Sequence, residues 1–172
     1  MELLERFALG ELEAFEALFR QFQGEVYRWI VRVVRDPGVA EDLTVETFWR
    51  IYRARARFDP SRSFGAWARR IATNVALEHL RRARPEVSLA ENPPSASPPD
   101  PVAQSELHDH IARAFAQLPA RLRVAATLAL IEERPYGEIG EALGISVGAV
   151  KSRVFRAARR LREKLKRSGM EP

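Results

Sequence analysis

Residues 135–161 read PYGEIGEALGISVGAVKSRVFRAARRL and contain two short amphipathic helical patterns, separated by the turn Gly144-Ile145-Ser146. Gly144 can adopt the positive φ that ends a helix, and the Ser146 hydroxyl can cap the next one. Two helices joined by such a tight turn form a helix-turn-helix. The sequence therefore predicts that the helix starting at Val147 is presented to a ligand.

This second helix has an apolar face and an opposite basic face. At about 100° per residue, the positions fall into two sets. We expect the inward set to be Val147, Val150, Val154, Ala157 and Leu161. We expect the outward set to be Gly148, Lys151, Ser152, Phe155, Arg156 and Arg159.

Basic, small and aromatic side chains on one helix face suit the major groove of DNA. Lys and Arg can bond guanine edges or phosphates, Ser can bond either strand, and an aromatic ring can contact a thymine methyl group. The alternative is an ordinary helical hairpin with a solvated basic face. Turn chemistry, periodicity and charge agree with one another, and together they favour DNA binding.

Charge divides the 172-residue chain into three blocks. The total is +5, made of +3 over residues 1–85, −3 over 86–105 and +5 over 106–172. The acidic block is rich in proline and contains neither Lys nor Arg, so we expect a flexible linker between two domains. It is either a passive spacer or an acidic strand that occupies a nucleic-acid channel.

The first block shows helical periodicity and no strand-like alternation of useful length. Helices are expected over residues 11–35, 39–57 and 64–84, and a further helix over 105–117 follows the linker. The prediction is an all-α fold of two small helical domains.

Composition excludes several classes of protein. The chain has no cysteine, so it has neither disulfides nor thiolate metal sites. The longest mainly apolar run, residues 124–131, is far short of a membrane span, and the N-terminus does not resemble a signal peptide. We expect a cytoplasmic protein without membrane insertion.

Catalytic sites are not indicated either. His108 and His110 lie on different faces of one predicted helix, and no nucleophile is placed beside a base. Gly137, Gly140 and Gly144 do not follow a strand, so they do not form a phosphate-binding loop. We expect no enzyme, no cofactor and no metal.

The chain resembles the extracytoplasmic-function group of bacterial RNA polymerase sigma factors, which belong to the sigma-70 family. In the first domain the resemblance rests on AEDLTVETF at 40–48, FDP at 58–60, Ser63-Phe64, Trp67, IATN at 71–74 and LRR at 80–82. In the second it rests on Leu118-Pro119, YGEI at 136–139, LGIS at 143–146 and GAVKSR at 148–153. Their order and spacing are specific to this family.

The resemblance implies a role for each domain. Domain 1–85 would dock on core polymerase and bind and melt the −10 element, linker 86–105 would enter the polymerase cleft, and domain 106–172 would bind the −35 element. The implied −35 contacts are Lys151, Ser152, Arg153, Phe155, Arg156 and Arg159. The implied −10 contacts, which would capture a base flipped from the non-template strand, are Ser63, Phe64, Trp67, Asn74 and Arg81.

The resemblance also implies partners. Asp42, Leu43, Glu46 and Phe48 would contact the β′ clamp of the polymerase, the second domain would contact the β flap, and an anti-sigma factor is expected. Two alternatives remain: a conventional helix-turn-helix regulator, and a sigma mimic that titrates an anti-sigma factor.

Three residues depart from the family pattern. Val45 replaces a usual Gln at the docking surface, Glu78 replaces a common Asp, and Gly140 replaces a usual Ala between the helices of the helix-turn-helix. Gly140 would cost about 1 kcal/mol of helix propensity.

Overall fold

The computed structural model describes residues 2–83 and 101–168, and for residues 101–107 the backbone alone. Every regular element in these ranges is helical, which confirms the all-α prediction. The first domain contains α1 (Glu2–Ala8), α2 (Leu12–Val34), α3 (Pro37–Ala54), the short 3₁₀ turn η1 (Arg55–Arg57) and α4 (Phe64–Arg82). The second contains α5 (Pro101–Ala116), α6 (Ala120–Ala126), the π-helical turn η2 (Thr127–Ile131), α7 (Tyr136–Leu143) and α8 (Val147–Arg167).

Local sequence sets the helix ends of the first domain. Arg35 ends α2 in the left-handed conformation, with φ of 62°. Asp36 then caps α3 by accepting a hydrogen bond from the Val39 amide at 3.1 Å, and Pro37 occupies the first helical position. Ser63 caps α4 in the same way, through the Ala66 amide at 3.3 Å. These caps place the two chain reversals within one or two residues of the predicted positions.

An aromatic cluster closes one end of the first domain. The fully buried Phe7 of α1 packs edge-on against Phe64, with 5.6 Å between ring centroids, and also contacts Phe58 and Trp67. Aromatic pairs in this geometry stabilise a core beyond the area that they bury. α1 was not expected as a separate helix, because seven residues are too few to show a reliable period. Its burial against later segments makes it part of the domain.

The second domain has its own small apolar centre between α5, α6 and α8. Ala114, Leu118, Leu122, Ala126, Ala157 and Leu161 are all buried there. The bend after α6 is made by η2, where the Glu132 amide bonds the Thr127 carbonyl at 3.0 Å. This π-helical turn redirects the chain towards α7.

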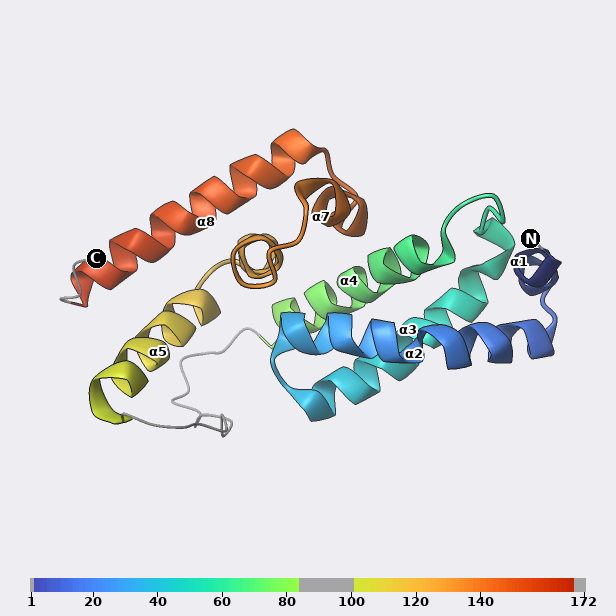
Figure 1. Cartoon of the computed structure of the whole chain (residues 1–172), viewed down its shortest axis with the longest axis horizontal. Helices are drawn as coiled ribbons and strands as arrows, with labels where there is room; N and C mark the ends of the chain where they lie inside the picture. Colours follow the sequence, from blue (N-terminus) through green and yellow to red (C-terminus); the bar gives the residue numbers. More distant parts are fainter. Residues whose placement is uncertain (1, 84–100, 169–172) are drawn as a thin grey trace.

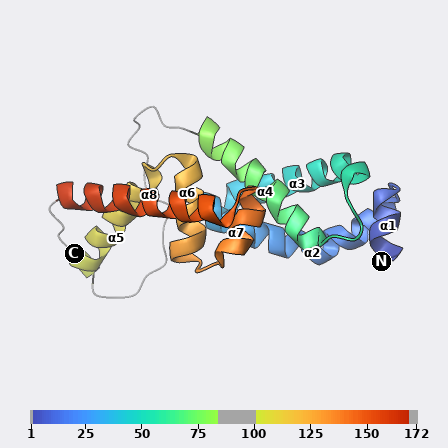
Figure 2. The ribbon, with the colours of Figure 1, turned by 90° about the horizontal axis from the view of Figure 1, so that it is seen from above.

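The two domains pack against each other, with α4 in contact with α6 and α7 (Figures 1 and 2). One hydrophobic cluster runs from Ile30 and Ala72 of the first domain to Leu128 and Ile139 of the second. Charged groups border this contact. Arg32 pairs with Glu132 at 3.1 Å, and the Arg134 guanidinium lies 5.7 Å from the centre of the Trp29 ring.

The structure shortens the predicted linker, residues 86–105, at its C-terminal end. Helix α5 begins at Pro101, so residues 101–105 are helical, because proline is well suited to a first helical turn. The rest of the predicted linker lies outside the described residues. None of the described helices is long and apolar enough to cross a membrane.

A buried hydrogen bond ties α2 to α4 and gives a test of the first domain. The Trp29 indole donates to the Thr73 hydroxyl at 2.9 Å, and that hydroxyl donates to the Arg69 carbonyl at 2.7 Å. Thr73→Val leaves the indole N–H without an acceptor, so we expect a loss of about 1–3 kcal/mol in the free energy of unfolding. Urea unfolding followed by circular dichroism measures this loss.

Thr47→Val is the matched control. Thr47 is equally buried, but its hydroxyl bonds the Leu43 carbonyl of its own helix, at 2.7 Å, and no side chain of another described helix. That carbonyl keeps its helical partner after substitution, so the loss should be smaller. Equal losses in the two variants would contradict the role given to the Trp29 bond.

Candidate nucleic-acid interface

The turn between α7 and α8 has the predicted helix-turn-helix geometry. Gly144 adopts a φ of 67°, and the Ile145 amide bonds the Gly140 carbonyl at 2.9 Å. Ser146 caps α8 through its hydroxyl, which accepts from the Ala149 amide at 3.2 Å. These local bonds therefore help to set the direction in which α8 leaves the turn.

Helix α8 presents the expected face to solvent. Gly148, Lys151, Ser152, Phe155, Arg156 and Arg159 are all exposed, and Phe155 reaches 70%. Val150, Val154, Ala157 and Leu161 are buried, as predicted. Val147 was wrongly placed inside, since it is 44% exposed. At the first helical position the side chain points back past the helix end, beyond the surface that the later turns bury.

The outward side chains differ in the hydrogen bonds and ion pairs that they make within the protein. Among the described residues, Arg156 bonds only the Ser152 carbonyl of its own helix, at 3.3 Å, whereas Arg159 pairs with Glu163 at 3.1 Å. Arg153 is half-buried at the edge of this face. Burial lowers the pKa of Arg153, and the charges of Arg121, Arg156 and Arg81 lower it further. The positive charges of Arg121, Arg156 and Arg81 therefore all act on Arg153 at this edge of α8.

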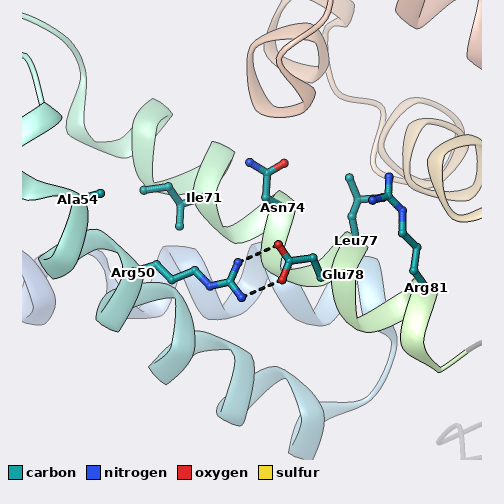
Figure 3. Close-up of a pocket in the computed structure, with 7 residues that line it drawn as sticks. All are labelled: Arg50, Ala54, Ile71, Asn74, Leu77, Glu78 and Arg81. Carbon is teal, nitrogen blue, oxygen red and sulfur yellow. Dashed lines mark hydrogen bonds and ion pairs between the residues drawn. The ribbon is translucent and has the colours of Figure 1, made fainter.

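A cleft of about 290 Å³ opens on the first domain between α3 and α4 (Figure 3). Asn74 and Arg81, two of the predicted −10 residues, line it together. No pattern in the sequence indicated that these two residues lie opposite α3. Its remaining lining consists of Arg50, Ala54, Ile71, Leu77 and Glu78.

The other predicted −10 residues lie elsewhere. Phe64 is 3% exposed inside the aromatic cluster, and Trp67 packs beside it with 6.0 Å between ring centroids. Neither lines the cleft, and in this conformation Phe64 has no ring face open to a base. Ser63 is exposed and caps α4. The structure thus brings together Asn74 and Arg81 but separates them from the aromatic residues.

The structure differs from the predicted docking surface on α3 at one residue, Phe48, which is buried. Asp42 is exposed, while Leu43 and Glu46 are partly exposed. Phe48 is only 3% exposed and packs on Phe19, whereas its neighbour Trp49 is 56% exposed and Val45 is 68% exposed. Trp49 was missed, although its spacing of three from Glu46 and four from Val45 puts all three on one face.

Gly140 is explained by the close approach of the two helices. A Cβ atom at this position would lie 2.7 Å from the Ile145 carbonyl oxygen. An alanine would therefore require the turn before α8 to move. In this chain Gly140 and the tight turn belong together.

A capped helix-turn-helix with an exposed basic second helix, carried by an all-α protein, defines a class: helix-turn-helix DNA-binding proteins. Comparison with known proteins narrows that class. The family model for sigma-70 region 2 matches residues 18–86, and the model for sigma-70 region 4 matches residues 108–161.

Several relatives match over nearly the whole chain. The RNA polymerase sigma factor CarQ of Myxococcus xanthus is 36% identical over 94% of this chain and 95% of its own. The extracytoplasmic-function (ECF) sigma factor SigW of Bacillus subtilis is 32% identical over 91% of each chain. BldN of Streptomyces coelicolor is 36% identical and longer, so that this chain spans 64% of its length.

Solved structures agree with this result. CnrH, in complex with the cytosolic domain of CnrY, is similar over 95% of both chains, with a TM-score of 0.62 and 26% identity. RpoE of Bartonella quintana, in complex with the anti-sigma factor NepR, covers 90% of this chain with a TM-score of 0.58. At 21% identity, that second match concerns the fold alone.

The chain belongs to the ECF RNA polymerase sigma factors. It is therefore a transcription initiation factor that recognises promoters.

Gly140→Ala tests the contact between the two helices. Because the added methyl group meets a backbone carbonyl, we expect a loss of about 1–3 kcal/mol in the free energy of unfolding, as for other overpacked sites. Urea unfolding measures it. Gly137→Ala is the control on the same helix, since nothing lies within 4 Å of its added Cβ. It should stabilise the protein by up to about 1 kcal/mol through helix propensity. If Gly137→Ala destabilised the protein and Gly140→Ala did not, the close approach of the two helices at Gly140 would be contradicted.

Proposed function

We propose that this sigma factor divides promoter recognition between two surfaces. The face of α8 reads the −35 element in the major groove, and the cleft beside α4 holds a flipped base of the −10 non-template strand. The observation that carries the proposal is the exposed face of α8, fixed by the Gly144 turn and the Ser146 cap.

The −35 role rests on the chemistry of that face. Lys151 and Arg156 offer charged donors, and Ser152 offers a hydroxyl group. Phe155 offers an exposed ring for a thymine methyl group. Arg159 and Arg153 stand at its edges, where phosphate contacts would position the helix. Among the first helix turns no carboxylate stands on this face, so nothing there repels the DNA backbone.

The −10 role rests on Asn74 and Arg81. The Asn74 amide can both donate and accept hydrogen bonds, and Arg81 can hold a phosphate at the rim of the cleft. Ser63 is exposed in the loop before α4, and its proposed contact with the strand lies outside the cleft. The aromatic residues Phe64 and Trp67 support that loop from inside the domain.

We infer that α3 docks on the β′ clamp of core polymerase. Its exposed surface combines the acidic Asp42 and Glu46 with the apolar Val45 and Trp49. Exposed aromatic residues beside charged groups are typical of binding hot spots. Leu43 is partly buried beneath this exposed surface, where it packs against the core. Phe48 packs on Phe19 inside the domain, so its role is to hold α3 in place and not to contact the polymerase.

The remaining assignments follow from the family. We infer contact of the second domain with the β flap, action in the cytoplasm, and binding and positioning without catalysis of its own. CnrH was solved with CnrY, and RpoE was solved with the anti-sigma factor NepR. We propose that this chain likewise binds an anti-sigma factor. The two alternatives, a conventional regulator and a sigma mimic, are not favoured, because both sigma regions are present and the basic face of α8 is intact.

The −35 assignment is tested by Arg156→Ala. Loss of one base or phosphate contact costs about 1–3 kcal/mol, so run-off transcription from a −35-dependent promoter should fall by about fivefold to 150-fold. Affinity for core polymerase should not change. Arg113→Ala removes the same charge from α5, where the guanidinium bonds the Asp109 carbonyl of its own helix at 3.2 Å. An equal fall in both variants would argue against a specific role for Arg156.

The docking assignment is tested by Trp49→Ala. Because this exposed ring contributes little to the core, the free energy of unfolding should stay within about 0.5 kcal/mol of the wild-type value. Affinity for core polymerase, measured by titration of labelled protein, should fall by about thirtyfold, the cost of a moderate hot spot. Leu12→Ala, at a residue that is 61% exposed on α2, is the control and should bind normally. Unchanged affinity of Trp49→Ala would place the docking surface elsewhere.

A further inference from the structure

The cleft between α3 and α4 also contains the carboxylate of Glu78, which has no part in the −10 role proposed for Asn74 and Arg81 (Figure 3). Glu78 lies one helical turn after Asn74, so both side chains leave the same face of α4. Ile71 and Leu77 add apolar surface to the same cleft. A cleft with apolar walls and a few fixed polar groups has the composition of a ligand site.

An ion pair holds the Glu78 carboxylate in place. Arg50 of α3 donates to it through both terminal nitrogens, at 2.9 and 2.8 Å. The third donor of Arg50, Nε, bonds Glu46 at 2.7 Å. Planar two-bond pairing fixes the plane of the carboxylate as well as its position. Glu78 is therefore a preorganised group.

Glu78 keeps acceptor capacity after this pairing. Each carboxylate oxygen has two lone-pair sites, and Arg50 uses one on each. Arg82 is a looser ion-pair partner, with 3.9 Å between its terminal nitrogen and one Glu78 oxygen. The side chain is 39% exposed. The hydrogen bond from Arg50 is the main cause that lowers the pKa of Glu78, so the group is ionised at neutral pH and can only accept. Any ligand group that meets it must be a donor.

Asn74 supplies the complementary chemistry. It is exposed, and within the described ranges its side chain makes no hydrogen bond to the protein. Its amide can donate to a ring nitrogen or carbonyl while Glu78 accepts from a neighbouring N–H group. The Glu78 carboxylate points towards Arg50 and the Asn74 amide points away from that pair (Figure 3), so a flat ring that lies between them would meet a donor at Asn74 and an obligate acceptor at Glu78.

We propose that Glu78 is a specificity-determining residue of this cleft, which selects a base with an exocyclic amine on its Watson–Crick edge and rejects thymine. Carboxylates accept from the N4 amine of cytosine in protein–DNA complexes, and flipped bases are read on their Watson–Crick edge. Thymine presents its O4 carbonyl in place of that amine, so two acceptors would face each other. The inference rests on the −10 role proposed for Asn74 and Arg81.

The test uses the full chain with core polymerase and premelted promoter templates. Each position of the −10 non-template strand carries cytosine or thymine in turn, and run-off transcript is measured. The wild-type protein should prefer cytosine at one position by about tenfold, the effect of one hydrogen bond to a charged group. Glu78→Gln should reduce that preference to about twofold or less, at that position alone, because an amide can turn its N–H₂ towards O4.

Two further variants separate specificity from structure. Glu78→Asp keeps the charge and should keep the preference for cytosine, even if it lowers total transcription by weakening the Arg50 pair. If Glu78→Gln does not fold by circular dichroism, Asn74→Asp replaces it. Asn74→Asp replaces the donor that faces the cytosine ring nitrogen with an acceptor, which the N3–H group of thymine can meet, so it should weaken or reverse the preference for cytosine. Glu25→Gln removes a carboxylate from the Arg69 pair outside the cleft and should leave the base preference unchanged.

The outcomes distinguish the two proposals. No transcript from any template with wild-type protein would overturn the proposed promoter role itself. Transcription without a base preference at any position, or with a preference that Glu78→Gln retains, would overturn the role of Glu78 and leave the promoter role standing.

Discussion

Close packing around α4 is the constraint on which the rest of the structure depends. This helix touches α2 and α3 of its own domain and α6 and α7 of the other. Ala68, Ala72 and Ala76 recur every four residues and are fully buried, so neighbouring backbones can approach closely. Larger side chains at these positions would separate the helices. The small residues of α4 therefore allow the neighbouring helices to pack closely, while Ile71, Asn74, Leu77, Glu78 and Arg81 of the same helix line the cleft.

Polar contacts refine this packing rather than create it. The Trp29–Thr73 bond sets α2 against α4, and the Arg50–Glu78 pair sets α3 against α4. Both join helices that apolar residues already bring together. The Arg50–Glu78 pair is half-exposed, and pairs of this kind contribute little to stability. Its value lies in orientation, because it fixes a carboxylate beside the cleft.

The orientation of α8 depends on residues that are close together in the sequence. Gly140, Gly144 and Ser146 determine the turn, and alternation of apolar and basic residues determines which face of α8 is buried. All of these features are short-range, so sequence reasoning predicted all six outward residues of the face. It misplaced Val147, because helical periodicity does not describe the first residue of a helix. The first domain was harder: Phe48 and Trp49 are adjacent aromatic residues, and periodicity alone did not separate the buried ring from the exposed one.

The sequence by itself determined the helical class, the helix-turn-helix, the basic face of α8 and the family, because these depend on local turn chemistry, short-range period and motif order. Only the tertiary structure decided that Phe64 and Phe48 are buried, that Trp49 is exposed, and that Asn74 and Arg81 share a cleft with Arg50 and Glu78. Arg50 and Glu78 are 28 residues apart and belong to different helices. Their meeting depends on how α3 crosses α4, which is set by packing over the whole domain and not by any local pattern.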